Sequence, residues 1–146
     1  MIDDEYLRIL MTIPTKINKC IDLLGEEYLS DAGLKPYYVQ YILYINEHDG
    51  ISQKDLNAVI PFDKSRISVV IHQLTDRGYV YNDSNGRNNS LHLTEKGKEV
   101  VPICKMFLDV MEKEIFNIDN YNPAQRQINI DLNERLDRLM ERLHHE

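Results

Sequence analysis

The stretch ISQKDLNAVIPFDKSRISVVIHQLTDRGYV, residues 51–80, decides the fold because it holds two short helices joined by a tight turn. Ser52 is placed to cap the first helix, and Pro61 ends it because proline has no N–H to donate inside a helix. A short turn later, Asp63 is placed to cap the second helix, and Gly78 lies at its end. These features predict a helix-turn-helix.

The residues that follow change from a helical period to alternation. Val80 begins a short strand, and Asn85-Gly86 is the dipeptide typical of a two-residue hairpin turn. Leu91 and Leu93 then alternate with polar residues, as in a strand with one buried face. We therefore predict a β-hairpin, the wing, directly after the helix-turn-helix.

The N-terminal segment predicts an amphipathic helix. Asp3 is placed to cap it, and Pro14 predicts that the helix is interrupted. Its apolar residues recur in steps of three and four: Ile2, Tyr6, Ile9, Ile13, Ile17, Cys20, Leu24 and Tyr28.

Two more helices are predicted after the wing. Thr94 is placed to cap the first, which runs to residue 116 with a kink expected at Pro102. Asn122 and Pro123 open the last helix. Its apolar stripe is Ile128, Leu132, Leu136, Leu139 and Leu143.

The predicted fold is mainly α with a small β-hairpin wing: a winged helix-turn-helix flanked by N- and C-terminal dimerisation helices. A small central module cannot bury both terminal stripes, and their seam-like spacing favours packing between two subunits. Packing of the stripes within one chain is the alternative.

Charge is unevenly distributed along the 146 residues. The formal net charge is −7, yet residues 52–98 carry a net +2 and the remainder carries −9. A basic middle segment between acidic flanks indicates that the middle faces a polyanion, although the excess is small.

The sequence resembles the multiple antibiotic resistance regulator (MarR) family over nearly its whole length. The helix-turn-helix of residues 51–80, its ending LTDRG and the wing ending LHLTEKGKEV carry the resemblance. It implies a homodimeric, sequence-specific DNA-binding transcriptional regulator, usually a repressor, that a small molecule or oxidant releases from a pseudo-palindromic operator. The corresponding segments are 1–34 for N-terminal dimerisation, 35–98 for the DNA-binding domain and 99–146 for C-terminal dimerisation.

The second helix of the helix-turn-helix predicts the DNA contacts. If its apolar residues face inward, the helical period turns a polar face outward, where it would enter the major groove. A solvated helix face without a partner is the alternative. The predicted contacts are Ser65, Arg66, Ser68, Val69, His72 and Gln73.

The wing adds Arg87 and Asn88 to the predicted contacts. A guanidinium at the tip of an Asn-Gly hairpin suits a narrow minor groove, whose negative potential attracts it. The family commonly has an acidic residue two positions before this arginine, where this chain has Asn85. This departure puts the rigidity of the wing and the affinity for DNA in question.

Four tyrosines crowd the helix that follows Pro36, and they are the predicted effector site: Tyr37, Tyr38, Tyr41 and Tyr44. Their aromatic faces and hydroxyl groups suit a small aromatic ligand, such as a phenolic acid. Packing in the core or at an interface is the alternative, and we favour it.

The remaining sequence features exclude several classes of protein. No phosphate loop, nucleophile motif or zinc-protease motif appears, so we expect no enzyme, no cofactor and no metal site. Cys20 and Cys104 lie far apart, which predicts two reduced, half-buried thiols and disfavours redox sensing. No membrane span or signal peptide appears, so we expect a cytoplasmic protein.

A different class of function stays open. The net charge of −7 and the missing wing acid also suit an acidic winged-helix module that binds another protein and has weak or no affinity for DNA.

Overall fold

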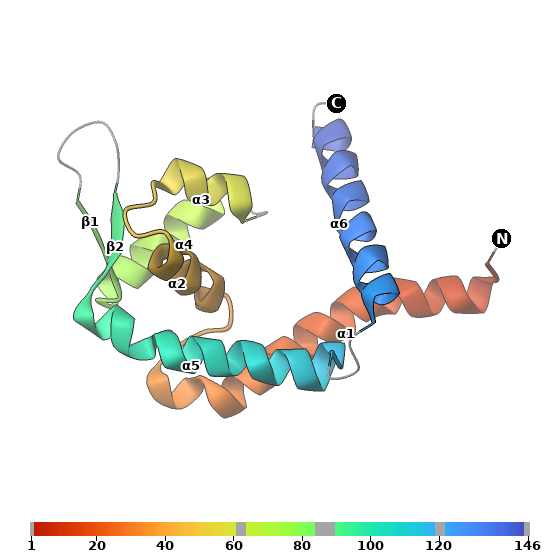
Figure 1. Ribbon diagram of the computed structural model, residues 1–146, viewed down its shortest axis with the longest axis horizontal. Helices are drawn as coiled ribbons and strands as arrows, with labels where there is room; N and C mark the ends of the chain where they lie inside the picture. Colours follow the sequence, from red (N-terminus) through yellow and green to blue (C-terminus); the bar gives the residue numbers. More distant parts are fainter. Residues whose placement is uncertain (1, 61–63, 84–89, 119–121, 145–146) are drawn as a thin grey trace. The chain divides into compact units, whose positions relative to one another are not determined.

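The computed structural model describes residues 2–60, 64–83, 90–118 and 122–144. The chain divides into two compact units, Met1–Met111 and Glu112–Glu146. Figure 1 shows the elements of both.

The first unit begins with α1 (Asp4–Tyr28), a helix of 25 residues. The Asp3 carboxylate accepts a hydrogen bond from the Tyr6 N–H at 2.8 Å, which confirms the predicted cap. The predicted interruption at Pro14 is wrong, since α1 continues through this residue. The Thr12 hydroxyl, two residues earlier, donates to the Ile9 carbonyl at 2.8 Å within the same helix. The proline lies in an exposed part of the helix, where water can satisfy the carbonyl that loses its partner.

A short 3₁₀ turn, η1 (Ser30–Ala32), leads to α2 (Tyr38–Glu47), the most buried helix of the unit. Its Tyr38, Tyr41, Ile42 and Ile45 side chains are completely inaccessible to water. α2 packs against α5 (Glu95–Met111) and against β2 (Leu91–Leu93). The hydrophobic core therefore centres on α2.

The predicted helix-turn-helix consists of α3 (Gln53–Val59) and α4 (Lys64–Asp76). The Ser52 hydroxyl accepts from the Asp55 N–H at 3.0 Å, which confirms the cap of α3. Leu56 and Ile60 at the end of α3 are buried in the core, whereas Val59 is 47% exposed. Asp63 and Pro61 lie outside the described residues.

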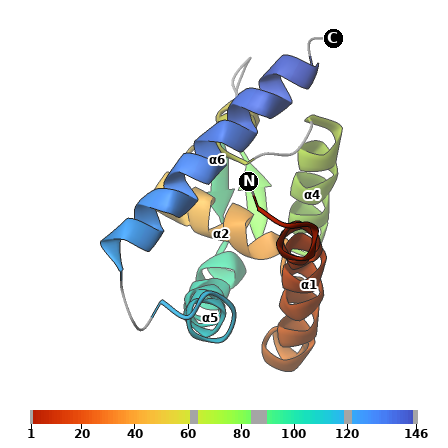
Figure 2. The same ribbon diagram turned by 90° about the vertical axis from the view of Figure 1, so that its right-hand side faces the viewer.

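The wing is an antiparallel pair of short strands, β1 (Val80–Asn82) and β2, in which Val80 pairs with Leu93 and Asn82 with Leu91. Gly78 precedes it with a φ of 80°, a left-handed conformation that glycine adopts without strain. This glycine ends α4 as predicted, and Leu91 and Leu93 are buried as predicted. Figure 2 shows the two strands behind α2, against which β2 packs.

The second unit contains the π-helical turn η2 (Glu112–Phe116) and α6 (Pro123–His144). The Asn122 side chain accepts from the Ala124 N–H at 2.9 Å, so the predicted start of α6 is confirmed. The predicted helix to residue 116 is wrong in its last turn, because the regular α-helix ends at Met111 and η2 follows it.

Candidate nucleic-acid interface

The helix α4 presents two faces of opposite character. Ile67, Val70, Ile71 and Leu74 are buried in the core, as the sequence pattern predicts. The six predicted DNA contacts lie on the rest of the helix surface. Gln73 is half-buried, and the other five are exposed: Ser65, Arg66, Ser68, Val69 and His72. The core thus anchors α4 and leaves its polar surface accessible.

A hollow of 490 Å³ runs along one flank of α4. Tyr37 from the turn before α2 forms one wall, and the other lining residues belong to α4: Ser65, Arg66, Val69, Val70 and Gln73. The structure therefore brings four of the six contacts predicted on α4 together with one of the four predicted effector tyrosines.

Gln73 joins α4 to the start of α2 by hydrogen bonds. The Tyr37 and Tyr38 hydroxyls both donate to its carbonyl oxygen Oε1, each at 3.1 Å. The two rings lie edge to face, with centroids 4.9 Å apart. Two causes raise the pKa of Tyr38: burial, which is the larger, and the neighbouring Tyr37 side chain. The Arg77 charge opposes this shift. The Tyr38 phenol therefore stays protonated at neutral pH and remains a donor.

Arg66, although exposed on α4, influences the pKa of the buried Tyr41 side chain. The Tyr41 hydroxyl is buried and has no hydrogen-bond partner among the described residues. Burial raises the pKa of Tyr41, and the positive charge of Arg66 lowers it by a smaller amount.

His72 and Asp76 form an exposed pair one helical turn apart. The His72 Nε2 and Asp76 Oδ2 atoms are 3.2 Å apart, and the side chains are 76% and 65% exposed. The pair therefore places a carboxylate beside one predicted DNA contact on the surface of α4. An acidic group there disfavours phosphates close to His72.

The base of the wing contains a hydrogen-bonded chain that sequence reasoning missed. His92 Nδ1 lies 2.8 Å from Asp49 Oδ1, and His92 Nε2 lies 3.0 Å from Ser90 Oγ. The Tyr81 ring stacks on His92 with centroids 5.1 Å apart. The signal was hard to find because Asp49 and His92 are 43 positions apart in the sequence.

The hydrogen-bonded series Asp49–His92–Ser90 has the residue types of a hydrolase triad but not the surroundings of one. The Ser90 N–H donates to Asn82 Oδ1, and the Leu91 N–H donates to the Ile51 carbonyl. Both amides next to the hydroxyl are therefore occupied and do not form an oxyanion hole. The Ser90 hydroxyl also donates to the Gly50 carbonyl at 3.3 Å. These hydrogen bonds connect the wing to the end of α2.

The remaining predicted site residues lie apart from the hollow or outside the described residues. Tyr38 and Tyr41 are fully buried, and Tyr44 stacks on His48 with ring centroids 6.3 Å apart. The four tyrosines thus do not line one common cleft. Arg87 and Asn88 lie outside the described residues.

The chain is similar to proteins of a known family. Residues 32–87 match the model of the MarR family. This segment includes α2, α3, α4 and β1, and therefore every predicted contact on α4. No curated protein sequence matches the chain closely enough to count as a relative.

Several solved MarR structures have the same fold over nearly the whole chain. A MarR transcriptional regulator from Methanosarcina mazei Go1 has a TM-score of 0.70 at 20% identity, with 97% of this chain and 94% of that chain covered. A MarR family transcriptional regulator from Listeria monocytogenes, complexed with 26mer DNA, has a TM-score of 0.69 at 20% identity, with 96% and 90% covered. The S. aureus MepR–DNA complex has a TM-score of 0.69 at 17% identity, with 95% and 99% covered. The predicted winged-helix fold is thereby confirmed.

Two further searches of the described residues gave negative results. No helix there is long and apolar enough to cross a membrane. No group of three or more His, Cys, Asp or Glu side chains in the described part of the chain lies close enough together to hold a metal ion.

Proposed function

We propose that this protein is a transcriptional regulator that binds a specific DNA sequence through the exposed surface of α4. The observation that carries the proposal is the polar surface of this helix on a MarR-family winged-helix scaffold, with Arg66 exposed beside Ser65 and Ser68. Arginine and serine side chains at the start of such a helix suit base edges and phosphates in the major groove. Two solved structures of the same fold contain DNA, which supports the same role here.

The regulator acts as a homodimer in this proposal. α1 and α6 each expose large apolar side chains that a soluble monomer would leave in water, among them Leu10, Ile13, Leu132 and Leu136. A second copy of the chain would cover them, and a two-fold dimer would read a pseudo-palindromic operator. Residues 1–34 and 99–146 then provide the dimer contacts, and residues 35–98 bind DNA in the cytoplasm.

Repression relieved by a small aromatic ligand completes the proposal. Tyr37 lines the hollow beside α4, and its hydroxyl is bonded to Gln73 on that helix. An aromatic acid bound there would compete directly for groups on the DNA-binding surface. Ligand and DNA would then oppose each other through differential binding to one surface.

The test is a fluorescence-anisotropy titration of the full-length protein with DNA from upstream of its own coding region. A scrambled duplex of equal length and composition is the control, and both are titrated at two salt concentrations. Preferential binding to the upstream duplex, weakened by salt, supports the proposal. Equal and weak binding to both duplexes contradicts autoregulation and favours the protein-binding alternative.

A further inference from the structure

Gln73 differs from the other predicted contacts because only one half of its carboxamide is available. A carbonyl oxygen has two lone pairs, and both face donors here, since the Tyr37 and Tyr38 hydroxyls each lie 3.1 Å from Oε1. The hydrogen bonds of the Gln73 side chain to other described residues both go to Oε1, and Nε2 retains two N–H donors. The side chain is half-buried and lines the hollow on the flank of α4.

The surroundings fix the direction of these hydrogen bonds. The Arg77 guanidinium lies over the Tyr38 ring, 5.6 Å from its centroid, and arginine has donors only. The Arg77 charge and its side-chain hydrogen bond both lower the pKa of Tyr38, as a donor on the phenol oxygen does, so the phenol proton is left to point toward Gln73. A rotated carboxamide would have to donate to the same Tyr38 oxygen in competition with Arg77. The Tyr38 phenol also keeps its proton at neutral pH, because burial raises its pKa.

The orientation of the carboxamide decides which base it can bind. A free glutamine binds adenine by two hydrogen bonds, donating to N7 and accepting from N6. A glutamine whose oxygen is occupied can only donate. Donors match guanine O6 and N7 or thymine O4, whereas adenine offers them N7 alone and turns its N6 donor toward the amide nitrogen.

We infer that Tyr37 and Tyr38 are positioning residues that hold Gln73 as a donor-only contact, so that the operator favours guanine or thymine over adenine where Gln73 reaches it. This inference rests on the proposed function, because it requires that α4 binds DNA. It assigns the two tyrosines a role in sequence specificity that requires no ligand.

The test is selection from a pool of duplexes with a randomised central region, carried out with full-length wild-type protein and with Y37F/Y38F. The double variant removes two hydroxyl groups and keeps both rings in the core. Y44F is the matched control, because Tyr44 lies on the same helix and stacks on His48 without contacting Gln73. Q73A identifies the base position that depends on Gln73, and circular dichroism with a melting curve confirms that each variant folds.

Q73A should lose its base preference at the one operator position that Gln73 contacts. At that position, we expect wild type and Y44F to select guanine or thymine. In Y37F/Y38F, the released carboxamide can bind adenine, so adenine should gain about tenfold relative to wild type at that position alone. An unchanged base profile in Y37F/Y38F overturns the inference, as does a profile that Q73A leaves unaltered. If the wild-type protein enriches no duplex, the proposed function fails, and the inference fails with it.

Discussion

The two cysteines occupy opposite environments, and their chemistry follows from that. Sequence reasoning expected both thiols to be half-buried, but Cys20 is exposed on α1 and Cys104 is completely buried. Burial raises the pKa of the Cys104 thiol to about 11. Because the thiolate is the reactive form, Cys104 is inert at neutral pH.

We predict that a thiol reagent at pH 7.5 leaves Cys104 of the C20S variant unmodified until the protein is unfolded. The same pKa predicts an alkaline effect. The folded thiol holds its proton more tightly than the unfolded one, so its contribution to stability is lost as pH rises from about 9 to about 11. Mass spectrometry after timed labelling measures the first effect. Rapid modification of native Cys104 would contradict the burial of this side chain.

Gly97 permits a close approach between the start of α5 and the backbone of Tyr79, just before β1. A Cβ atom at this position would lie 2.1 Å from the Tyr79 carbonyl oxygen and 3.3 Å from the Leu93 Cβ. G97A must therefore move either the start of α5 or the start of β1. We predict a loss of about 3 kcal/mol in the free energy of unfolding, measured by urea denaturation.

E99A, at an exposed position on the same helix, is the control and should change the free energy of unfolding by less than about 0.5 kcal/mol. Equal stabilities of G97A and E99A would show that the two segments do not pack as closely as described.

Among the elements, α5 depends on a single side chain for its start. The Thr94 hydroxyl accepts from the Gly97 N–H at 3.0 Å and donates to the Gly78 carbonyl, so it joins the end of α4 to the beginning of α5. We predict that T94A lowers the free energy of unfolding by about 2 kcal/mol. The substitution removes the cap of α5 and leaves the Gly78 carbonyl without its hydrogen-bond donor. T94S keeps the hydroxyl and should remain close to wild type in the same denaturation experiment. Equal losses in the two variants would assign the effect to the methyl group.

Elements with a local signal were predictable from the sequence. Capping side chains, a glycine at a helix end and the inward face of α4 follow from spacing within a few residues, and Asp3, Ser52, Gly78 and Asn122 confirm this. Pro14 was misjudged because proline removes a hydrogen bond and clashes with the preceding turn, which predicts a break, yet α1 continues through it. No pattern in the neighbouring residues indicates this continuation.

The candidate site could be predicted only in part, for a related reason. The exposed residues of α4 follow from the helical period, but their partners come from distant segments. Gln73 meets Tyr37 across 36 positions, and His92 meets Asp49 across 43. No periodicity within one chain predicts such contacts, and without them the tyrosines look like a ligand cleft and not like supports for α4.

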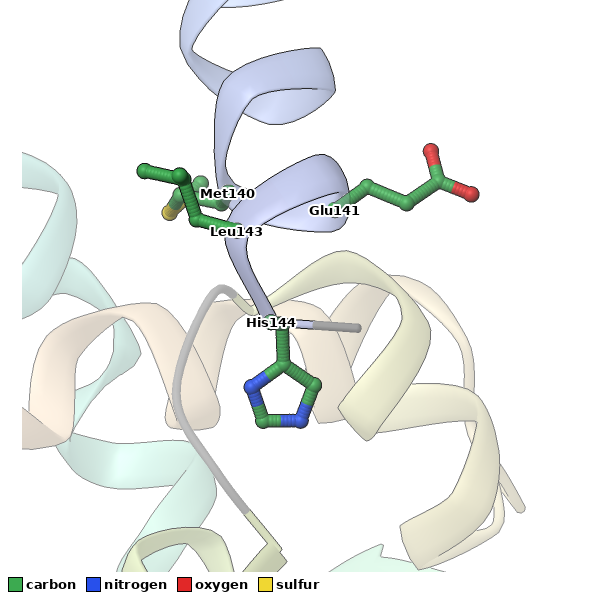
Figure 3. A pocket seen from close by; sticks show the side chains of 4 residues that line it. All are labelled: Met140, Glu141, Leu143 and His144. Carbon is green, nitrogen blue, oxygen red and sulfur yellow. The ribbon is translucent and has the colours of Figure 1, made fainter. Parts of the chain in front are cut away.

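For the whole molecule, the proposed dimer makes a prediction about α6. Figure 3 shows Met140 and Leu143 on one side of this helix and Glu141 pointing the other way. Leu136 and Leu139, one turn earlier, are 47% and 40% exposed and lie on the stripe that contains Leu143. L136E/L139E should raise the dissociation constant of the dimer by about 100-fold or more, because two apolar contacts are replaced by charges.

Analytical ultracentrifugation measures the effect, with E141K as the control on the opposite face of α6. E141K is expected to remain dimeric. A wild-type protein that sediments as a single chain would contradict the proposed homodimer, and a fully dimeric L136E/L139E would move the interface away from α6.

The most direct test of the central claim is the affinity of R66A for the upstream duplex, compared with that of K105A. Both variants remove one exposed cation from the first unit, but Arg66 lies on α4 and Lys105 on α5. If α4 binds DNA, R66A should raise the dissociation constant by about tenfold or more and reduce its salt dependence, whereas K105A should behave as wild type. If R66A binds the duplex as tightly as K105A does, the surface of α4 is not the DNA-binding surface and the proposed function is contradicted.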